Sequence, residues 1–219
     1  MSSKKSKEFP EGSIHKVNDG DIEILKYNNS RSILVRFKET GYERLARAGD
    51  IRSMEVKDRL KPSVHGVGFL GDGEFGVRSR FYNVWADMIS RCYCQKALKK
   101  RPSYIGCRVC DEWHNFQVFN KWCEENHPKD GIYYELDKDI NSEFKPGKVY
   151  SPEFCKFVTP QENMQESKAK THKLINPNGD IVEIYNLNKF CKENNLNNGC
   201  MNQLSLGKME KHKGWRMVQ

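Results

Sequence analysis

Residues 133–163, YYELDKDINSEFKPGKVYSPEFCKFVTPQEN, constrain the fold more than any other part of the chain. A short apolar and aromatic run ends at Asp137 and Asp139, and a polar loop follows it. A second strand-like run covers residues 156–158, and a helix-start signal then leads to Asn163. This order of acidic residues, loop, strand and helix predicts a compact ββα unit. Two carboxylates in such a unit can hold a hard divalent cation.

Asp137 and Asp139 also have a simpler interpretation. Aspartate is frequent where a strand gives way to a turn, because its carboxylate accepts hydrogen bonds from nearby backbone N–H groups. In that case the two side chains only cap a turn at the edge of the loop. The residues alone agree with both interpretations.

The charge balance favours a nucleic-acid partner. The 219 residues include 37 Lys and Arg against 29 Asp and Glu, which gives a formal net charge of +8. An excess of this sign attracts polyanions such as double-stranded DNA. The basic segment LKKRPSY at residues 98–104 is expected to form a loop that contacts the DNA backbone. No apolar run approaches the length of a membrane span, and the N-terminus lacks an apolar signal segment, so we expect a cytoplasmic protein without a membrane partner.

The low hydrophobic fraction of 37% suits several small modules better than one large core. Apolar residues at helical spacing predict helices over residues 81–93 and 116–126. A glycine-rich stretch contains GxGxxG, but no Walker lysine follows it and no strand precedes it, so we reject a nucleotide site. The predicted boundaries are 1–11 for a basic disordered tail, 12–64 for a β-rich DNA-binding domain, 65–80 for the glycine-rich linker, 81–167 for a central domain and 168–219 for a C-terminal module.

In the β-rich segment, residues 21–27 and 32–38 alternate apolar and polar side chains around an Asn-Asn-Ser turn. This pattern is typical of a β-hairpin. A third strand is expected at residues 51–56, after a helical turn or a long loop. Arginines on one face of such a sheet would contact DNA phosphates or simply stay solvated. They are Arg31, Arg36, Arg44, Arg47 and Arg52.

Eight cysteines occur in a chain with no sign of secretion, so we expect free thiols rather than disulfides. Cys107 and Cys110 have the CxxC spacing of half a zinc site, and Cys92 and Cys94, or Cys155, could complete it. A structural Zn²⁺ is one interpretation of this group. The other is that these cysteines are small buried hydrophobic residues.

Four stretches in a fixed order carry a family resemblance. They are YNVWADMISRCY at 82–93, VCDEWHNFQVFNKW at 109–122, LDKDI at 136–140 and YSPEFCKFVTPQEN at 150–163. Together they resemble the phage-encoded HNH-type endonucleases, especially those related to homing enzymes. The resemblance implies an α+β fold with a ββα-metal domain, metal-dependent hydrolysis of DNA phosphodiesters, and the cytoplasm of an infected bacterial cell. One metal site per chain implies one cut strand per visit, so double-strand cleavage needs a homodimer or two visits.

The resemblance also assigns roles to residues. Asp137 takes the family's Asp position, and Asn163 takes the position on the helix. Lys138 stands where the family has a general-base His, and Phe154 stands where it has a loop Asn. The implied variant site has Asp137, Lys138, Asp139 and Asn163 as catalytic residues, with Asp137, Asp139 and Asn163 binding Mg²⁺ or another divalent cation. The alternative is a DNA-binding regulator or architectural protein whose nuclease core is no longer catalytic.

The C-terminal segment predicts a hairpin over residues 173–186, then a helix, a turn and a helix over residues 186–208. It resembles the small DNA-binding repeats of phage and intron homing endonucleases, including the closing KGWR at 213–216. The resemblance implies a second helix in the major groove, where amide side chains pair with adenine. The implied base readers are Asn198, Asn202 and Gln203, and the implied phosphate contacts are Lys208, Lys211, Lys213 and Arg216. A protein-interaction module is the alternative.

Overall fold

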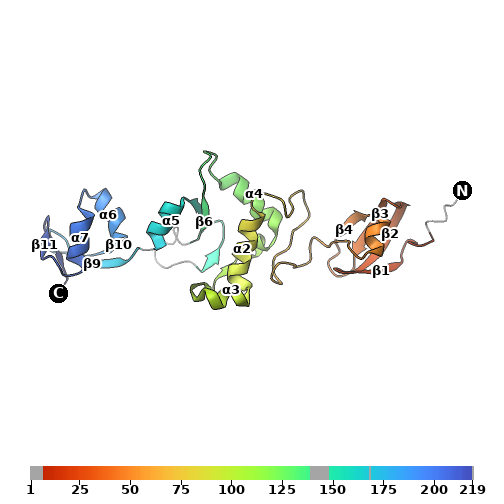
Figure 1. The fold of residues 1–219 in the computed structure, drawn as a ribbon, viewed down its shortest axis with the longest axis horizontal. Coiled ribbons are helices and arrows are strands. Elements are labelled where there is room, and N and C mark those ends of the chain that lie inside the picture. Colours follow the sequence, from red (N-terminus) through yellow and green to blue (C-terminus); the bar gives the residue numbers. More distant parts are fainter. Residues whose placement is uncertain (1–6, 139–147, 168, 219) are drawn as a thin grey trace.

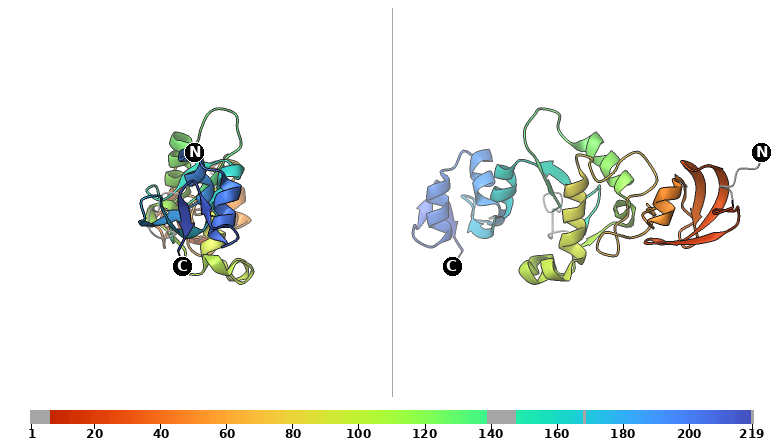
Figure 2. Two further views of the ribbon diagram at one scale, coloured as in Figure 1. Left: turned by 90° about the vertical axis from the view of Figure 1, so that its left-hand side faces the viewer. Right: turned by 45° about the vertical axis from the view of Figure 1, so that its right-hand side comes forward.

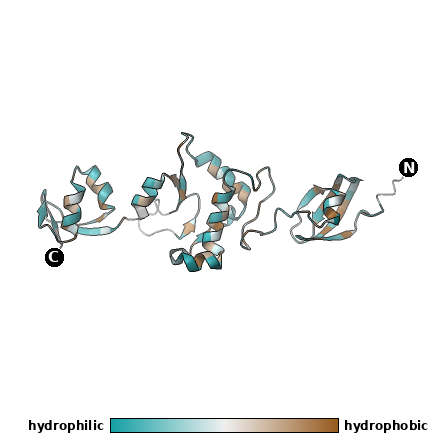
Figure 3. Ribbon diagram, viewed as in Figure 1, coloured by the Kyte–Doolittle hydropathy of each residue, from teal (hydrophilic) through white to brown (hydrophobic). Residues whose placement is uncertain are grey.

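The computed structural model describes residues 7–138, 148–167 and 169–218. It is a mixed α+β protein with several small sheets, and Figure 1 shows three compact units along its long axis. The right-hand view in Figure 2 shows the same succession. Each unit has its own cluster of buried apolar side chains, and Figure 3 shows hydrophobic residues in all three. The helices described here include none that is long and apolar enough to cross a bilayer.

The N-terminal unit is a four-stranded antiparallel sheet with its strands in sequence order. The strands are β1 (Ile14–Val17), β2 (Gly20–Asn29), β3 (Ser32–Phe37) and β4 (Glu43–Ala46). Alternate residues in the first half of β2 and along β3 point inward, so that Ile22, Ile24, Ile33 and Val35 are fully buried. Burial of one sheet face therefore fixes this hairpin, and the hairpin prediction is confirmed.

The strand that follows the β2–β3 hairpin lies elsewhere than expected. It is β4, which pairs with β3, and the short helix α1 (Ala48–Arg52) comes after it. The prediction of a strand at residues 51–56 is therefore wrong. Ala48 and Ile51 are both buried. Their spacing of three residues places them on the same side of a helical turn, which explains why a helix forms there.

Residues that precede β1 also pack onto this unit. Phe9 is buried in the sheet's core, and the Glu8 carboxylate forms an ion pair of 2.6 Å with the Arg52 guanidinium. The prediction of a disordered tail over residues 1–11 is therefore wrong from Glu8 onward. Residues 1–6 lie outside the described part of the chain.

The central unit is built around α2 (Tyr82–Tyr93) and α4 (Phe116–Asn126), which confirms both helix predictions. Trp85 and Trp113 are fully buried in its core. Trp85 Nε1 donates a 2.7 Å hydrogen bond to the Trp113 carbonyl oxygen, which satisfies the only polar atom of a large core side chain. Smaller elements complete the unit: the 3-10 helix η2 (Asp111–His114) and the parallel strands β5 (Arg108–Val109) and β7 (Val149–Tyr150).

The basic segment after α2 is helical. The loop expected at residues 98–104 is wrong, because these residues end α3 (Gln95–Lys100) and form the 3-10 helix η1 (Pro102–Tyr104). Pro102 occupies the first position of η1, where its missing N–H costs no hydrogen bond. The basic side chains of this segment are thus held on short helices.

The glycine-rich segment packs onto the start of α4. Gln117 Nε2 donates hydrogen bonds to the carbonyl oxygens of Leu70 (2.7 Å) and Phe75 (3.0 Å). Gly71 has a φ of 75°, and a Cβ atom there would lie 2.0 Å from Asn115 Oδ1. Glycine is required at this position because Asn115, which caps α4, approaches so closely.

The C-terminal unit joins a four-stranded sheet to two helices. The sheet order is β10-β9-β12-β11, from β9 (Thr171–Ile175), β10 (Ile181–Tyr185), β11 (Lys211–His212) and β12 (Trp215–Met217). Helices α6 (Leu187–Glu193) and α7 (Asn198–Ser205) pack on a core in which Leu174, Met201 and Leu204 are fully buried. The predictions of a hairpin and of a helix, turn and helix are confirmed.

Candidate functional site

A strand, a strand and a helix lie together between the central core and the C-terminal unit (Figure 1). They are β6 (Glu135–Asp137), β8 (Lys156–Val158) and α5 (Pro160–Ser167). The strands are antiparallel, with Asp137 opposite Lys156, and α5 contacts β6. This is the order of elements that the sequence pattern predicts for a ββα unit.

Helix α5 begins at a capping box. Thr159 Oγ1 accepts a 3.2 Å hydrogen bond from the Glu162 backbone N–H, and the Glu162 carboxylate accepts 2.8 Å bonds from the Thr159 backbone N–H and hydroxyl. The Thr159 backbone N–H holds the pKa of the Glu162 carboxyl below its usual range. This reciprocal bonding fixes the first turn of α5, and therefore the place of Asn163 one residue later.

Asn163 faces strand β6. Its Nδ2 donates a 2.6 Å hydrogen bond to the Glu135 carboxylate, and both residues are half-buried. Glu135 and Asp137 are two residues apart on one strand, so their side chains leave the same face of it. The amide of Asn163 and the carboxylates of Glu135 and Asp137 therefore belong to one face of the ββα unit. Sequence reasoning missed Glu135, because its role depends on the contact with Asn163 of α5.

Lys138 has a different environment. It is buried, at 8% exposure, and its Nζ lies 5.8 Å from the centroid of the Tyr104 ring and 5.9 Å from that of Tyr150. A cation against aromatic faces is stabilised by their negative electrostatic potential. This location favours a packing role for Lys138 over contact with a substrate, and its catalytic role stays a prediction. Asp139 lies outside the described residues.

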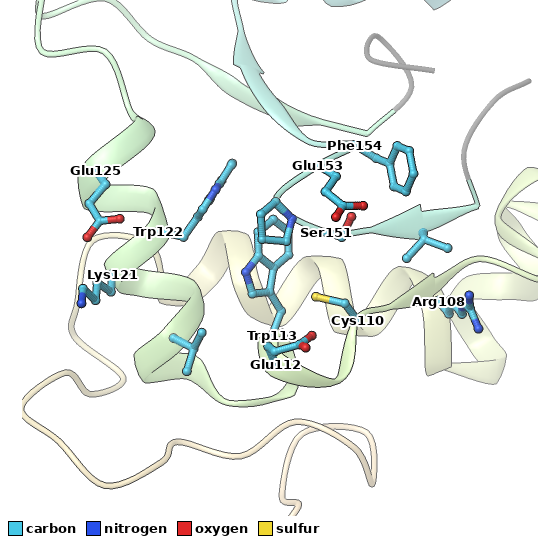
Figure 4. Close-up of a pocket in the computed structure, with 13 residues that line it drawn as sticks. Arg108, Cys110, Glu112, Trp113, Lys121, Trp122, Glu125, Ser151, Glu153 and Phe154 are labelled. Atoms are coloured by element: carbon cyan, nitrogen blue, oxygen red, sulfur yellow. The ribbon is translucent and has the colours of Figure 1, made fainter. Parts of the chain in front are cut away.

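The residue at the family's loop-Asn position lines a groove. Phe154 is 36% exposed and borders an open cavity of about 700 Å³, together with Trp113 and Trp122. Figure 4 shows these rings with Ser151 and Glu153 around the same space. A phenyl ring supplies no donor atom for a metal, so Phe154 adds nothing to a cation site.

The donor set of the ββα unit fits a hard cation. Glu135 and Asp137 offer carboxylate oxygens, and Asn163 offers an amide oxygen because its Nδ2 already donates to Glu135. Mg²⁺ and Ca²⁺ take such oxygen ligands, whereas Zn²⁺ favours nitrogen and sulfur. Within residues 7–138, 148–167 and 169–218, no three His, Cys, Asp or Glu side chains form a group that could hold a metal. The site therefore depends on the Asn163 amide or on further oxygen ligands.

The four cysteines proposed for zinc lie in or beside the central core. Cys92, Cys107 and Cys155 are buried and Cys110 is half-buried. Burial raises the pKa of the Cys92 and Cys155 thiols to about 12 and that of Cys110 to about 11. Zinc binds thiolates, and such surroundings favour neutral thiols instead. They agree with small buried hydrophobic residues, and zinc stays a prediction.

The N-terminal arginines do not share one face of the sheet. Arg36 lies opposite Glu43 and forms a 2.7 Å ion pair with it, whereas Arg44 lies opposite the buried Val35. Because neighbouring positions of a strand point to opposite faces, Arg36 and Arg44 diverge, and the expectation of one arginine face is wrong for them. Arg52 pairs with Glu8, as described above. Arg31 and Arg47 are exposed.

The predicted base readers of the C-terminal unit all lie on α7. Asn198, Asn202 and Gln203 are exposed on this helix, while Met201 and Leu204 are buried.

The predicted phosphate contacts follow α7. Lys211 and Arg216 lie opposite each other on β11 and β12, and Lys208 is exposed between α7 and β11. Lys213, in the turn between these strands, donates a 2.9 Å hydrogen bond through Nζ to the Asn195 carbonyl oxygen.

The comparisons with known proteins find nothing that matches: no family model fits the sequence, and neither a curated protein nor a solved structure is significantly similar.

Proposed function

We propose that this protein is a metal-dependent DNA endonuclease whose catalytic unit is β6, β8 and α5. The observation that carries the proposal is the hydrogen bond from Asn163 on α5 to Glu135 on β6, on the strand face that also carries Asp137. It joins a helix side chain to the strand face that carries two carboxylates, in a protein of net positive charge.

In this proposal Asp137 and the Asn163 amide oxygen hold a divalent cation, with further oxygen ligands completing its coordination. The cation, when bound, supplies charge stabilisation to the scissile phosphate and lowers the pKa of attacking water. Glu135 fixes the orientation of the Asn163 amide by accepting its N–H. The exposed Lys156 lies opposite Asp137 on β8, where its ammonium is placed to attract a phosphate oxygen. Sequence reasoning missed Lys156 as well.

Double-stranded DNA is the proposed substrate. The net charge of +8 attracts a polyanion, and the exposed amides of α7 suit the edges of bases in the major groove. One catalytic unit per chain cuts one strand, so cleavage of both strands requires a homodimer or two visits.

Nicking of supercoiled plasmid tests the proposal. We expect Mg²⁺ or Mn²⁺ to convert supercoiled DNA into open circles, EDTA to stop the reaction, and Asp137→Ala to abolish it. Asp130→Ala is a matched control, because this exposed carboxylate precedes β6 and hydrogen-bonds only to Tyr134 and the Ile132 backbone N–H among the bonds described. A wild-type protein that binds DNA but never nicks it contradicts the proposal.

The second candidate is a DNA-binding protein without nuclease activity. The buried position of Lys138 against Tyr104 and Tyr150 favours it, because Lys138 stands where the HNH-type enzymes have their general base. The plasmid experiment separates the two candidates, since this one predicts salt-sensitive DNA binding that is the same with and without a divalent cation.

A further inference from the structure

A second cavity is lined by residues of α2 and α3 and by Arg101, which follows α3. Its volume is about 390 Å³, and basic side chains dominate its lining. Arg91 comes from α2, Lys96 and Lys100 come from α3, and Arg101 follows α3. The single lining carboxylate is Asp87. Four cations against one anion make a local excess of positive charge.

Most of this charge is available to a ligand. Lys96, Lys100 and Arg101 are exposed, and none of them forms an ion pair with a carboxylate of the described residues. Arg91 is half-buried at the cavity wall, and its guanidinium lies over the Tyr104 ring. The cavity therefore has one half-buried cation and three exposed ones.

Two tyrosines connect the cavity to the ββα unit. The Arg91 guanidinium lies 6.0 Å from the centroid of the Tyr104 ring, and Lys138 Nζ contacts the same ring and that of Tyr150. Lys138 directly follows Asp137, the last residue of β6. The Tyr104 ring thus lies near both Arg91 of the cavity and Lys138, the neighbour of the carboxylate strand.

We propose that this cavity binds a backbone phosphate of the DNA strand that lies next to β6. An arginine guanidinium grips phosphate oxygens in pairs, lysine ammonium groups add point charges, and such contacts position a protein on DNA without reading its sequence. The inference deepens the proposed function, because it assigns a DNA-contacting face to the central unit. It requires DNA binding but no catalysis.

Binding measured over a range of salt concentrations in EDTA tests the inference. Removal of one cation that neutralises a phosphate makes the slope of log affinity against log salt shallower by about one. We expect Lys100→Ala/Arg101→Ala to reduce the slope by about two and to weaken binding to all DNA sequences alike. The matched control is Lys121→Ala/Lys129→Ala, which removes two exposed charges from the same unit outside the cavity. Equal slopes for wild type and both variants would overturn the inference.

Cys94 offers an independent reporter, because it lines the same cavity and is half-buried. The Ala97 backbone N–H lowers the pKa of its thiol, so an anionic thiosulfonate reagent should modify it readily. We expect duplex DNA in EDTA to slow modification of Cys94 at least tenfold, as peptide mass spectrometry measures. Cys110, which lines the groove beside Phe154, should keep its modification rate. Unchanged labelling of Cys94, or equal protection by millimolar inorganic phosphate alone, contradicts a DNA-backbone site.

These readouts separate the inference from the proposed function. A protein that protects Cys94 and shows the slope change but cuts no plasmid supports the inference and refutes the nuclease proposal. A protein that nicks plasmid without either effect keeps the nuclease proposal and overturns the inference.

Discussion

Asn163 Nδ2 lies 2.6 Å from a Glu135 carboxylate oxygen, so the first turn of α5 is tied to strand β6 by one short, charge-assisted hydrogen bond. Because Nδ2 of Asn163 faces Glu135, the amide oxygen Oδ1 points away from it. It also makes Glu135 a positioning residue for the proposed cation site, next to Asp137.

Asn163→Ala should separate α5 from β6. The variant loses a hydrogen bond to a charged group, and such bonds contribute about 1.5–3 kcal/mol when buried, so we expect about 1 kcal/mol for this half-buried pair. Calorimetric unfolding measures the loss. Gln165→Ala, on the same helix, is the comparison variant; an Asn163→Ala protein as stable as Gln165→Ala would show that the bond contributes nothing.

The capping box of α5 should depend on pH. The folded-state pKa of Glu162 lies below its ordinary value of 4.5, chiefly because the Thr159 backbone N–H bonds to the carboxylate. A depressed folded pKa stabilises α5 above pH 4.5, and this contribution is lost as the pH falls through the folded pKa. Amide hydrogen exchange in α5 should therefore be slower in wild type than in Glu162→Ala at neutral pH. The difference should shrink in acid; a difference independent of pH contradicts the assignment.

Cysteine reactivity should follow the surroundings of each thiol. Burial raises the pKa of Cys92 and Cys155 to about 12, and the Ala97 backbone N–H lowers that of Cys94. We expect iodoacetamide to alkylate Cys94 first and to leave Cys92 and Cys155 intact in the folded protein, as peptide mapping would show. Denatured protein is the control, where all eight should react. Alkylation of Cys155 as fast as Cys94 in the folded protein would contradict the burial described for the core.

Trp85→Phe should weaken the central unit strongly. Trp85 is fully buried, and its loss leaves the Trp113 carbonyl oxygen without its 2.7 Å donor and opens a cavity. These two effects together cost about 2–4 kcal/mol. Trp122→Phe serves as the control, because Trp122 is only half-buried beside the groove. Similar melting temperatures for the two variants would mean that the Trp85 bond and packing are not central to this core.

Short sequence patterns predicted the helices and strands that depend mainly on residues near one another in the chain. The Thr159-to-Glu162 capping box, the period-two residues of β2 and β3 and the apolar spacing of α2 each gave the right element. Strand β4 was missed because only Ala46 of its four residues is buried, so no apolar alternation marks it. Its pairing with β3 is a tertiary event.

The candidate site was predictable in part. Asp137 and Asn163 stood out from the sequence, and both belong to the ββα unit. Glu135 was missed because a carboxylate within a short apolar run carries no signal until the helix that contacts it is in place. The burial of Lys138 depends on Tyr104 and Tyr150, which lie far from it along the chain. Neither relationship has a local pattern.

The cleavage rate of Glu135→Gln tests the central claim most directly. Single-turnover nicking of supercoiled plasmid with Mg²⁺ would be compared for wild type, Glu135→Gln, Asp137→Asn and the control Glu112→Gln, which changes an exposed carboxylate at the groove. We predict a loss of about 10- to 100-fold for Glu135→Gln, as for other residues that orient metal ligands, with a larger loss for Asp137→Asn and none for the control. Wild-type rates in both Glu135→Gln and Asp137→Asn would contradict a cation site on this face of β6.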